Sequence, residues 1–132
     1  YIVRVASGRL SALNIFGDDY PTIDGTGERD YIHVMDLAEG HLAALNFISN
    51  ETGWHAINLG TGHSTSVFEL VRKFESIAHQ QIPLKVTFRR PGDLPVYYAK
   101  SDKAKSLLGW EARRSIEDMC KTAWAWEKAQ NS

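Results

Sequence analysis

The fold is decided by the stretch Gly25-Thr26-Gly27-Glu28-Arg29-Asp30-Tyr31-Ile32-His33-Val34-Met35-Asp36-Leu37-Ala38. It places a glycine-rich turn, an arginine, an extended segment and the start of a helix in direct succession. An arginine held at the mouth of a strand can grip a planar anion with two parallel hydrogen bonds. Arg29 is therefore the first candidate for an anion-binding residue.

The apolar pattern on either side of this stretch predicts alternating strands and helices. Residues 30–34 alternate as an extended segment, and Asp36 is a suitable N-cap for a helix over residues 37–49. The other predicted elements are a helix ending near Gly8, strands at 13–16, 55–59, 84–88 and 96–99, a brief helix from Ser101 to Leu108, and helices capped by Ser66 with Glu69 and by Ser115 with Asp118. Strands interleaved with helices predict an α/β fold.

Composition is that of an ordinary globular chain with a balanced charge. The length of 132 residues fits one domain, residues 1–132. Fifteen basic side chains against sixteen acidic ones leave a net charge of -1, which favours neither nucleic acid nor a membrane surface as a partner. No apolar run approaches the roughly 18 residues of a membrane span. The single cysteine, Cys120, cannot form an internal disulfide, which fits a reducing, cytoplasmic compartment.

Several catalytic signatures are absent from the chain. Gly60-x-Gly62 follows a predicted strand, but Thr65 occupies the place of the third glycine of a dinucleotide-binding loop, so we interpret it as a tight turn. No Tyr-x-x-x-Lys pair occurs, because the residues four places after the tyrosines are Val5, Asp24, Met35, Ser101 and Asp102. Cys120 lies on an apolar helix stripe as an inert thiol, and the histidines lack metal-ligand spacing.

Two clusters of arginine and tyrosine remain as candidates for binding. Arg29 and Tyr31 are two residues apart on an extended segment and so share a face, while Arg90, Asp93 and Tyr97 lie in and beside a loop. Two arginines can neutralise a diphosphate, a carboxylate can accept from ribose hydroxyls, and tyrosines offer a flat face to a sugar. The alternative is that the arginines are surface residues paired with Asp30 and Asp93 and that the aromatics only fill gaps.

A set of motifs in this order and spacing resembles the second half of the UDP-galactose (UDP-glucose) 4-epimerases, a branch of the extended short-chain dehydrogenases. The motifs are Ile15-Phe16-Gly17-Asp18-Asp19-Tyr20-Pro21-Thr22, residues 24–38, residues 58–62, Arg90-x-Gly92-Asp93-Leu94-Pro95 and Leu108-Gly109-Trp110. The resemblance runs from about Tyr1 to Ala129. One departure is Pro91, where the family commonly has glutamate.

The resemblance implies a role for each candidate residue. Arg29 and Arg90 match the two arginines that hold the diphosphate, Asp93 the carboxylate on the uridine ribose, Phe16 the residue beside the uracil, Tyr97 the tyrosine facing the hexose, and Tyr31 the aromatic close to the nucleotide. The family epimerises UDP-glucose and UDP-galactose at C4 in galactose metabolism and depends on NAD.

The same resemblance implies that this chain is the C-terminal, substrate-binding portion of an extended Rossmann-type dehydrogenase, with part of the Rossmann sheet and a small α/β cap region. The NAD loop and the catalytic Ser/Tyr/Lys set belong to the family's first half. We therefore expect a part of an NAD-dependent isomerase that is inactive alone, does not bind NAD, and has the missing N-terminal half or a second copy of itself as partner. The apolar pattern that begins at Tyr1 fits an element already under way.

Two alternatives stay open at this point. One is another sugar-nucleotide enzyme of the same superfamily, such as a dTDP- or GDP-sugar dehydratase or a UDP-uronate epimerase. The other is a stand-alone nucleotide-sugar binding or interaction module, which would bind UDP without NAD.

Overall fold

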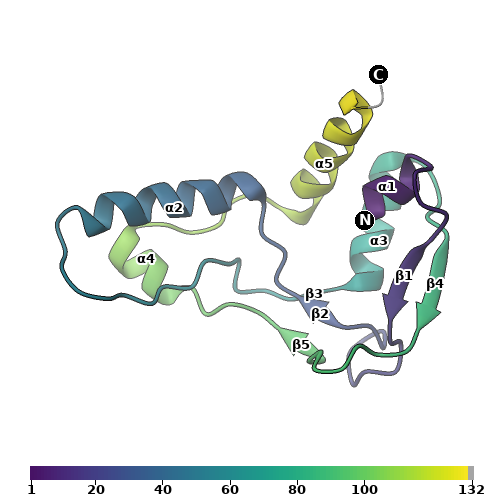
Figure 1. Ribbon diagram of the computed structural model, residues 1–132, viewed down its shortest axis with the longest axis horizontal. Helices are drawn as coiled ribbons and strands as arrows, with labels where there is room; N and C mark the ends of the chain where they lie inside the picture. The colour runs from purple at the N-terminus through teal and green to yellow at the C-terminus, as the bar shows by residue number, and fades with distance from the viewer. Residues whose placement is uncertain (131–132) are drawn as a thin grey trace.

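The computed structural model describes residues 1–130 as an elongated α/β molecule with helices at both ends (Figure 1). In chain order the elements are α1 (Ile2–Ala6), β1 (Leu13–Phe16), β2 (Glu28–Arg29), α2 (Val34–Ile48), β3 (Thr65–Ser66), α3 (Val67–Ala78), β4 (Leu84–Thr87), β5 (Val96–Tyr97), α4 (Asp102–Leu108) and α5 (Ile116–Gln130). No helix within residues 1–130 is long and apolar enough to cross a membrane.

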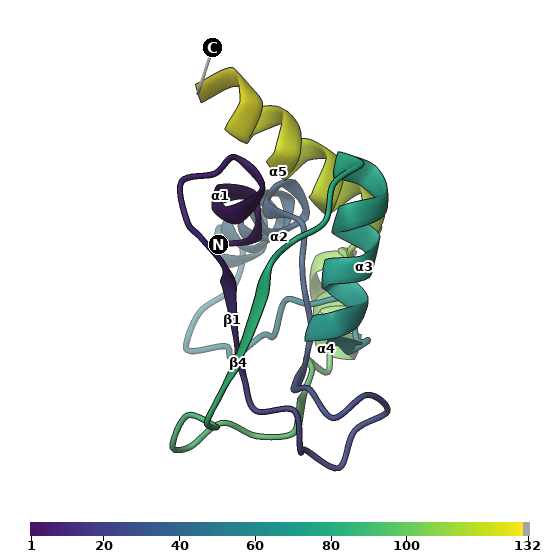
Figure 2. The same ribbon diagram turned by 90° about the vertical axis from the view of Figure 1, so that its right-hand side faces the viewer.

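One end of the molecule contains the main core, where α1, α3 and α5 gather beside β1 and β4 (Figure 2). The core residues, of which those on α3 follow the predicted helical stripe, are Val5, Val71, Phe74, Ile82 and Cys120. The ring of Phe74 meets that of Trp124 edge to face, with 5.9 Å between centroids. Burial raises the pKa of the Cys120 thiol, in agreement with its prediction as an inert core residue.

Two small sheets determine which loops meet. β1 and β4 pair in parallel with Phe16 opposite Thr87, so the loops that leave both strands emerge at the same end. β2 lies between β3 and β5, pairing antiparallel with β3 and parallel with β5, which puts Arg29 opposite Tyr97. Residues 88–95 connect β4 to β5, so this loop runs from the end of β1 to the start of β2 (Figure 1).

The other end of the molecule is formed by α2 and α4 (Figure 1). The predicted start of α2 is wrong. The helix begins at Val34 rather than Leu37, and its N-cap is His33, whose Nδ1 accepts a hydrogen bond of 3.0 Å from the backbone N–H of Met35. Asp36 is instead fully buried and accepts from the backbone N–H groups of Arg113 and Arg114 at 3.1 and 2.9 Å. Asp36 is thus bound to a segment 78 residues away and is not free to cap the helix, and His33 takes that role.

The predicted strand at 55–59 is also wrong: no strand is formed there within the described residues. A strand requires pairing with the backbone of a neighbouring strand, whereas the Ala56 carbonyl accepts a hydrogen bond from the Lys103 ammonium at 2.8 Å. The extended segment predicted at 30–34 is displaced: the paired strand β2 is Glu28–Arg29, and Val34 is already part of α2. Capping by Ser66, Ser115 and Gly109 is confirmed, with Gly109 in the left-handed region at φ 62°.

Candidate functional site

Three segments that are distant in the sequence enclose a cavity of about 550 Å³ beside β1. Its lining includes Phe16 from β1, Arg29 and Tyr31 from β2 and the residues after it, and Arg90 and Asp93 from the loop between β4 and β5. We call it the arginine cavity. The convergence follows from the two parallel pairings. The pairing of β4 with β1 places the start of the loop 88–95 beside the end of β1, and the pairing of β5 with β2 places its end beside the start of β2.

Arg29 is held in position mainly by the backbone. Its Nη1 donates to the carbonyl oxygens of Glu28 at 2.8 Å and of Leu94 at 2.9 Å, while its Nη2 lies 3.8 Å from Oδ2 of Asp93. A Cβ on Gly27 would lie 3.2 Å from Nη1, so the glycine leaves room for the guanidinium. The side chain is therefore fixed before any ligand arrives.

Arg90 reaches the cavity from its other side. Its guanidinium lies over the Phe16 ring, 4.5 Å from the centroid, and its Nε donates to Oδ2 of Asp93 at 3.0 Å. Among residues 1–130 its two Nη atoms have no hydrogen-bond partner, which leaves donors available for an anion. Both arginines thus approach one oxygen of Asp93, whereas the alternative expectation paired Arg29 with Asp30.

The two predicted tyrosines have different positions. Tyr31 forms part of the wall of the arginine cavity, and burial raises the pKa of its hydroxyl while the charge of Arg29 opposes the rise, so it stays protonated at neutral pH. Tyr97 pairs with Arg29 through the backbone, but its side chain is 63% exposed and does not line the arginine cavity.

Sequence reasoning missed Tyr20, which also lines the cavity. The residue is buried, its hydroxyl has no hydrogen-bond partner among the described residues, and the guanidinium of Arg89 covers its ring at 4.2 Å from the centroid. Tyr20 precedes Pro21 in a segment rich in turn residues, so nothing in the local pattern indicates a buried side chain. The residue that covers its ring, Arg89, is distant in the sequence.

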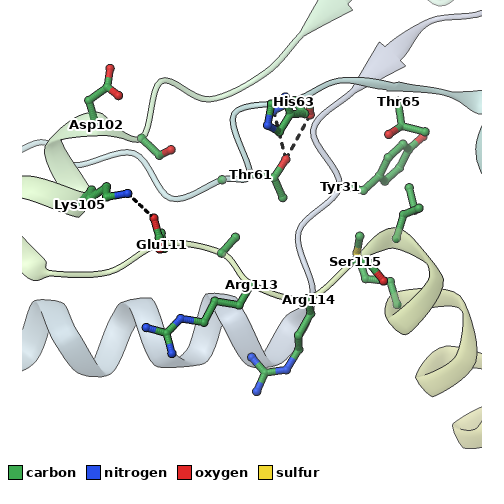
Figure 3. Close-up of a pocket in the computed structure, with 15 residues that line it drawn as sticks. Tyr31, Thr61, His63, Thr65, Asp102, Lys105, Glu111, Arg113, Arg114 and Ser115 are labelled. Atoms are coloured by element: carbon green, nitrogen blue, oxygen red, sulfur yellow. Dashed lines mark hydrogen bonds and ion pairs between the residues drawn. The ribbon is translucent and has the colours of Figure 1, made fainter.

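A second cavity of about 500 Å³ lies on the other side of Tyr31, between the turn at 60–65 and the segment 111–116 (Figure 3). Lys105 forms an ion pair with Glu111 at 2.7 Å at its edge, and the side chains of Arg113 and Arg114 extend away from it toward α2 (Figure 3). Its basic groups are therefore neutralised or directed elsewhere, unlike those of the arginine cavity.

Asp30 joins the arginine-bearing segment to the rest of the fold. Its carboxylate accepts from the backbone N–H groups of Thr61, Gly62 and Ala99 at 3.0 to 3.1 Å and from the Thr61 hydroxyl at 2.6 Å. Burial alone would raise the pKa of Asp30, but these hydrogen bonds together hold it below its ordinary value. One carboxylate thus fixes the position of its neighbour Arg29 relative to β5.

The same contacts decide how the Gly60-x-Gly62 turn is used. In a dinucleotide-binding loop, free backbone N–H groups at this turn receive the phosphates. Here the N–H groups of Thr61 and Gly62 already donate to Asp30, and a Cβ on Gly60 would come within 2.5 Å of the Ala99 Cβ. The turn packs against protein and does not fit the phosphates of NAD.

Replacing Asp30 by asparagine tests this anchoring role. All its partners are donors, so an amide NH2 will face an N–H group in either orientation, and we expect the free energy of unfolding to fall by about 1 to 2 kcal/mol. Urea denaturation measures the change. Asp18→Asn removes the same charge from an exposed site and will leave stability within about 0.5 kcal/mol of the unmodified chain. Equal stability of the two variants would contradict the anchoring role.

Comparisons with known proteins give consistent matches over nearly the whole chain. A family model described as GDP-mannose 4,6 dehydratase matches residues 1–123. The chain is 51% identical over 129 residues to UDP-glucose 4-epimerase of Bacillus subtilis (strain 168) and 55% identical over 130 residues to UDP-glucose 4-epimerase 3 of Oryza sativa subsp. japonica. These alignments cover 98% and 97% of this chain but 38% and 35% of the relatives, so the chain spans little more than a third of their length.

Solved structures agree. A UDP-glucose 4-epimerase from Bifidobacterium longum in complex with NAD+ and UDP is 44% identical, with a TM-score of 0.95 over 99% of this chain and 39% of that one. A UDP-glucose-4-epimerase from Stenotrophomonas maltophila with bound NAD and formylated UDP-arabinopyranose is 45% identical, with a TM-score of 0.94 over the same shares. The resemblance noted from the motifs and the predicted α/β fold class are both confirmed.

Proposed function

We propose that this chain, which belongs to the family described as GDP-mannose 4,6 dehydratase, binds the UDP part of a UDP-hexose within an NAD-dependent UDP-glucose/UDP-galactose 4-epimerase, and its similarity to UDP-glucose 4-epimerases supports this. The observation that carries the proposal is the convergence of Arg29 and Arg90, which are 61 residues apart, on one cavity. Two guanidinium groups there match the charge and the planar donor geometry that a diphosphate requires.

The rest of the arginine cavity supplies groups suited to the other parts of the nucleotide. Asp93 can accept from the ribose hydroxyls, and Phe16, whose ring is covered by Arg90 on one face, is the candidate for the residue beside the uracil. Within residues 1–130, β1 pairs with β4 along one edge. The backbone N–H and C=O groups of Asn14 and Phe16 on its other edge, which lines the cavity, can form hydrogen bonds with the polar groups of a base. Tyr31, in the cavity wall, is the candidate for the aromatic close to the nucleotide, and Tyr97 is the candidate for a contact to the hexose.

We propose that binding of the UDP part in the arginine cavity is what this chain contributes to epimerisation. Binding energy from the remote nucleotide would hold the reacting carbon of the hexose in place while the sugar itself stays free to turn over. NAD would supply the hydride chemistry from a site formed outside these residues. The Gly60-x-Gly62 turn is filled by Asp30, so no residue here is assigned to NAD.

We further propose that residues 1–132 act as one UDP-sugar-binding unit of a cytoplasmic enzyme of galactose metabolism. Its partner would be the Rossmann half of such an enzyme or a second copy of the chain. The support is an exposed apolar surface on α2 that includes Val34, Met35, Leu42, Leu45 and Ile48. Such a surface favours a protein partner over solvent.

Calorimetric titration of UDP into the purified 132-residue chain tests the proposed function. We expect saturable binding that weakens markedly for UMP, because UMP lacks the second phosphate. The proposal fails if no binding is detected up to about 10 mM UDP, which corresponds to a binding free energy weaker than about 2.7 kcal/mol. Titrations with GDP and dTDP in parallel decide between a uridine-specific site and the dehydratase alternative that the family description keeps open.

The isolated chain should neither bind NAD nor interconvert UDP-galactose and UDP-glucose. The turn that resembles a dinucleotide loop is occupied by Asp30, and no Tyr-x-x-x-Lys pair is present in the sequence. A coupled assay for UDP-glucose formation and a calorimetric titration with NAD measure the two activities. Turnover by the purified chain would overturn this prediction without affecting the UDP-binding proposal.

A further inference from the structure

We infer that Asp93 is a specificity-determining residue that makes the arginine cavity select nucleoside diphosphates over free pyrophosphate. The inference rests on the proposed function and extends it, because the resemblance gives Asp93 only a contact to ribose. In this structure the Asp93 carboxylate contacts both arginines. It is therefore an internal anion that the incoming ligand must accommodate.

The geometry that carries the inference is the sharing of one carboxylate oxygen. Oδ2 of Asp93 accepts from Nε of Arg90 at 3.0 Å and lies 3.8 Å from Nη2 of Arg29. The Asp93 side chain is only 26% exposed and belongs to the cavity lining. A diphosphate that reaches both arginines therefore comes within a few ångström of a like charge.

The loop keeps Asp93 beside the arginines rather than leaving it free to swing away. The backbone N–H of Asp93 donates to the Arg90 carbonyl at 3.2 Å, closing a turn in which Gly92 has a φ of 86°. Arg29 is likewise fixed by the carbonyls of Glu28 and Leu94. The carboxylate is thus a built-in part of the site that every ligand meets.

Charge and hydrogen bonding together produce the selectivity. Free pyrophosphate gains two guanidinium contacts but meets the uncompensated repulsion of Asp93. A nucleoside diphosphate brings ribose hydroxyls, which donate to the same carboxylate in charge-assisted hydrogen bonds and offset the repulsion. The site therefore requires the nucleoside for tight binding of the phosphates.

Asp93→Asn in the 132-residue chain separates these effects, since the amide keeps the size and one acceptor but removes the charge. Calorimetry with sodium pyrophosphate and with UDP gives the two dissociation constants. We expect pyrophosphate to bind about threefold to fivefold tighter, as loss of a partly exposed like charge predicts. We expect the preference for UDP over pyrophosphate to fall by about tenfold, because the ribose contact loses its charge assistance.

Asp19→Asn is the matched control. Asp19 forms an exposed ion pair with Arg89 at 2.7 Å in a neighbouring loop and does not line the arginine cavity, so the preference should stay unchanged. The inference is overturned if Asp93→Asn weakens both ligands equally, if it leaves the preference unaltered, or if Asp19→Asn changes the preference by as much. If the unmodified chain binds pyrophosphate and UDP equally well, the inference fails while the diphosphate site stands; if it binds neither, the proposed function itself fails.

Discussion

Replacing either Arg29 or Arg90 with alanine will weaken UDP binding by about 2 to 3 kcal/mol, and replacing both will reduce binding below detection. Each substitution removes charge-assisted hydrogen bonds to the diphosphate, which are worth about that much per contact. Arg29 is fixed by two backbone carbonyls, so no neighbouring group takes over its place. Calorimetric titration of UDP into each variant measures the loss.

Arg89→Ala is a demanding control for this result. It removes the same charge next to Arg90, but Arg89 pairs with Asp19 and covers Tyr20 instead of lining the arginine cavity. Its substitution should change the dissociation constant by less than about threefold, the effect of a long-range, screened charge. The diphosphate assignment is wrong if the Arg29 and Arg90 variants bind UDP as tightly as this control.

Replacing Asp36 with alanine will lower the free energy of unfolding by about 3 to 5 kcal/mol. Asp36 is fully buried, accepts from the N–H groups of Arg113 and Arg114, and pairs with the Arg114 guanidinium. Removing Asp36 leaves two backbone N–H groups without their acceptor and takes away the buried partner of the Arg114 guanidinium, which keeps, among residues 1–130, only the exposed Glu39. The loss is a large share of a typical domain stability, so α2 will separate from the segment that leads into α5.

Glu39→Ala separates burial from simple charge pairing. Glu39 contacts the same guanidinium at 2.8 Å, but its side chain is 47% exposed, so its loss should cost less than about 1 kcal/mol. Urea denaturation of both variants gives the comparison. Unfolding free energies within 1 kcal/mol of each other would show that burial of Asp36 contributes nothing.

The stability from Asp36 also has a defined dependence on pH. Burial alone would raise the pKa of Asp36, but hydrogen bonds from Arg114 and Arg113 hold it below the ordinary value of 3.8. A folded-state pKa below the unfolded value gives stability that is present above the unfolded value and is lost as pH falls through the folded one. The unmodified chain should therefore lose more stability than Asp36→Ala as pH falls below about 4.

Much of the fold could be predicted because its determinants are local. The stripe of α3, the caps at Ser66 and Ser115, and the left-handed Gly109 each depend on residues within one or two helical turns. The same is true of β1, whose apolar residues lie between turn signals. These elements formed where the pattern indicated.

The wrong predictions depend on partners far away in the sequence. Asp36 has good N-cap chemistry, yet the backbone of Arg113 and Arg114 competes for its carboxylate, and His33 caps the helix instead. The segment 55–59 is predicted as a strand but has no neighbouring strand to pair with within residues 1–130. Neither outcome can be read from a window of neighbouring residues.

The candidate site shows the same division. The residue types suited to a diphosphate were evident from the sequence, and the family resemblance supplied their roles. The sharing of one Asp93 oxygen and the anchoring by Asp30 depend on the pairing of β2 with β5, which sequence alone does not specify. The buried Tyr20 and the outward side chain of Tyr97 depend on tertiary packing in the same way.

A crystal structure of this chain grown with UDP tests the central claim most directly. Our account predicts that oxygens of a single diphosphate lie within about 3.2 Å of guanidinium nitrogens from both Arg29 and Arg90, with the ribose against Asp93. A nucleotide bound elsewhere, or a diphosphate that contacts neither arginine, would contradict it.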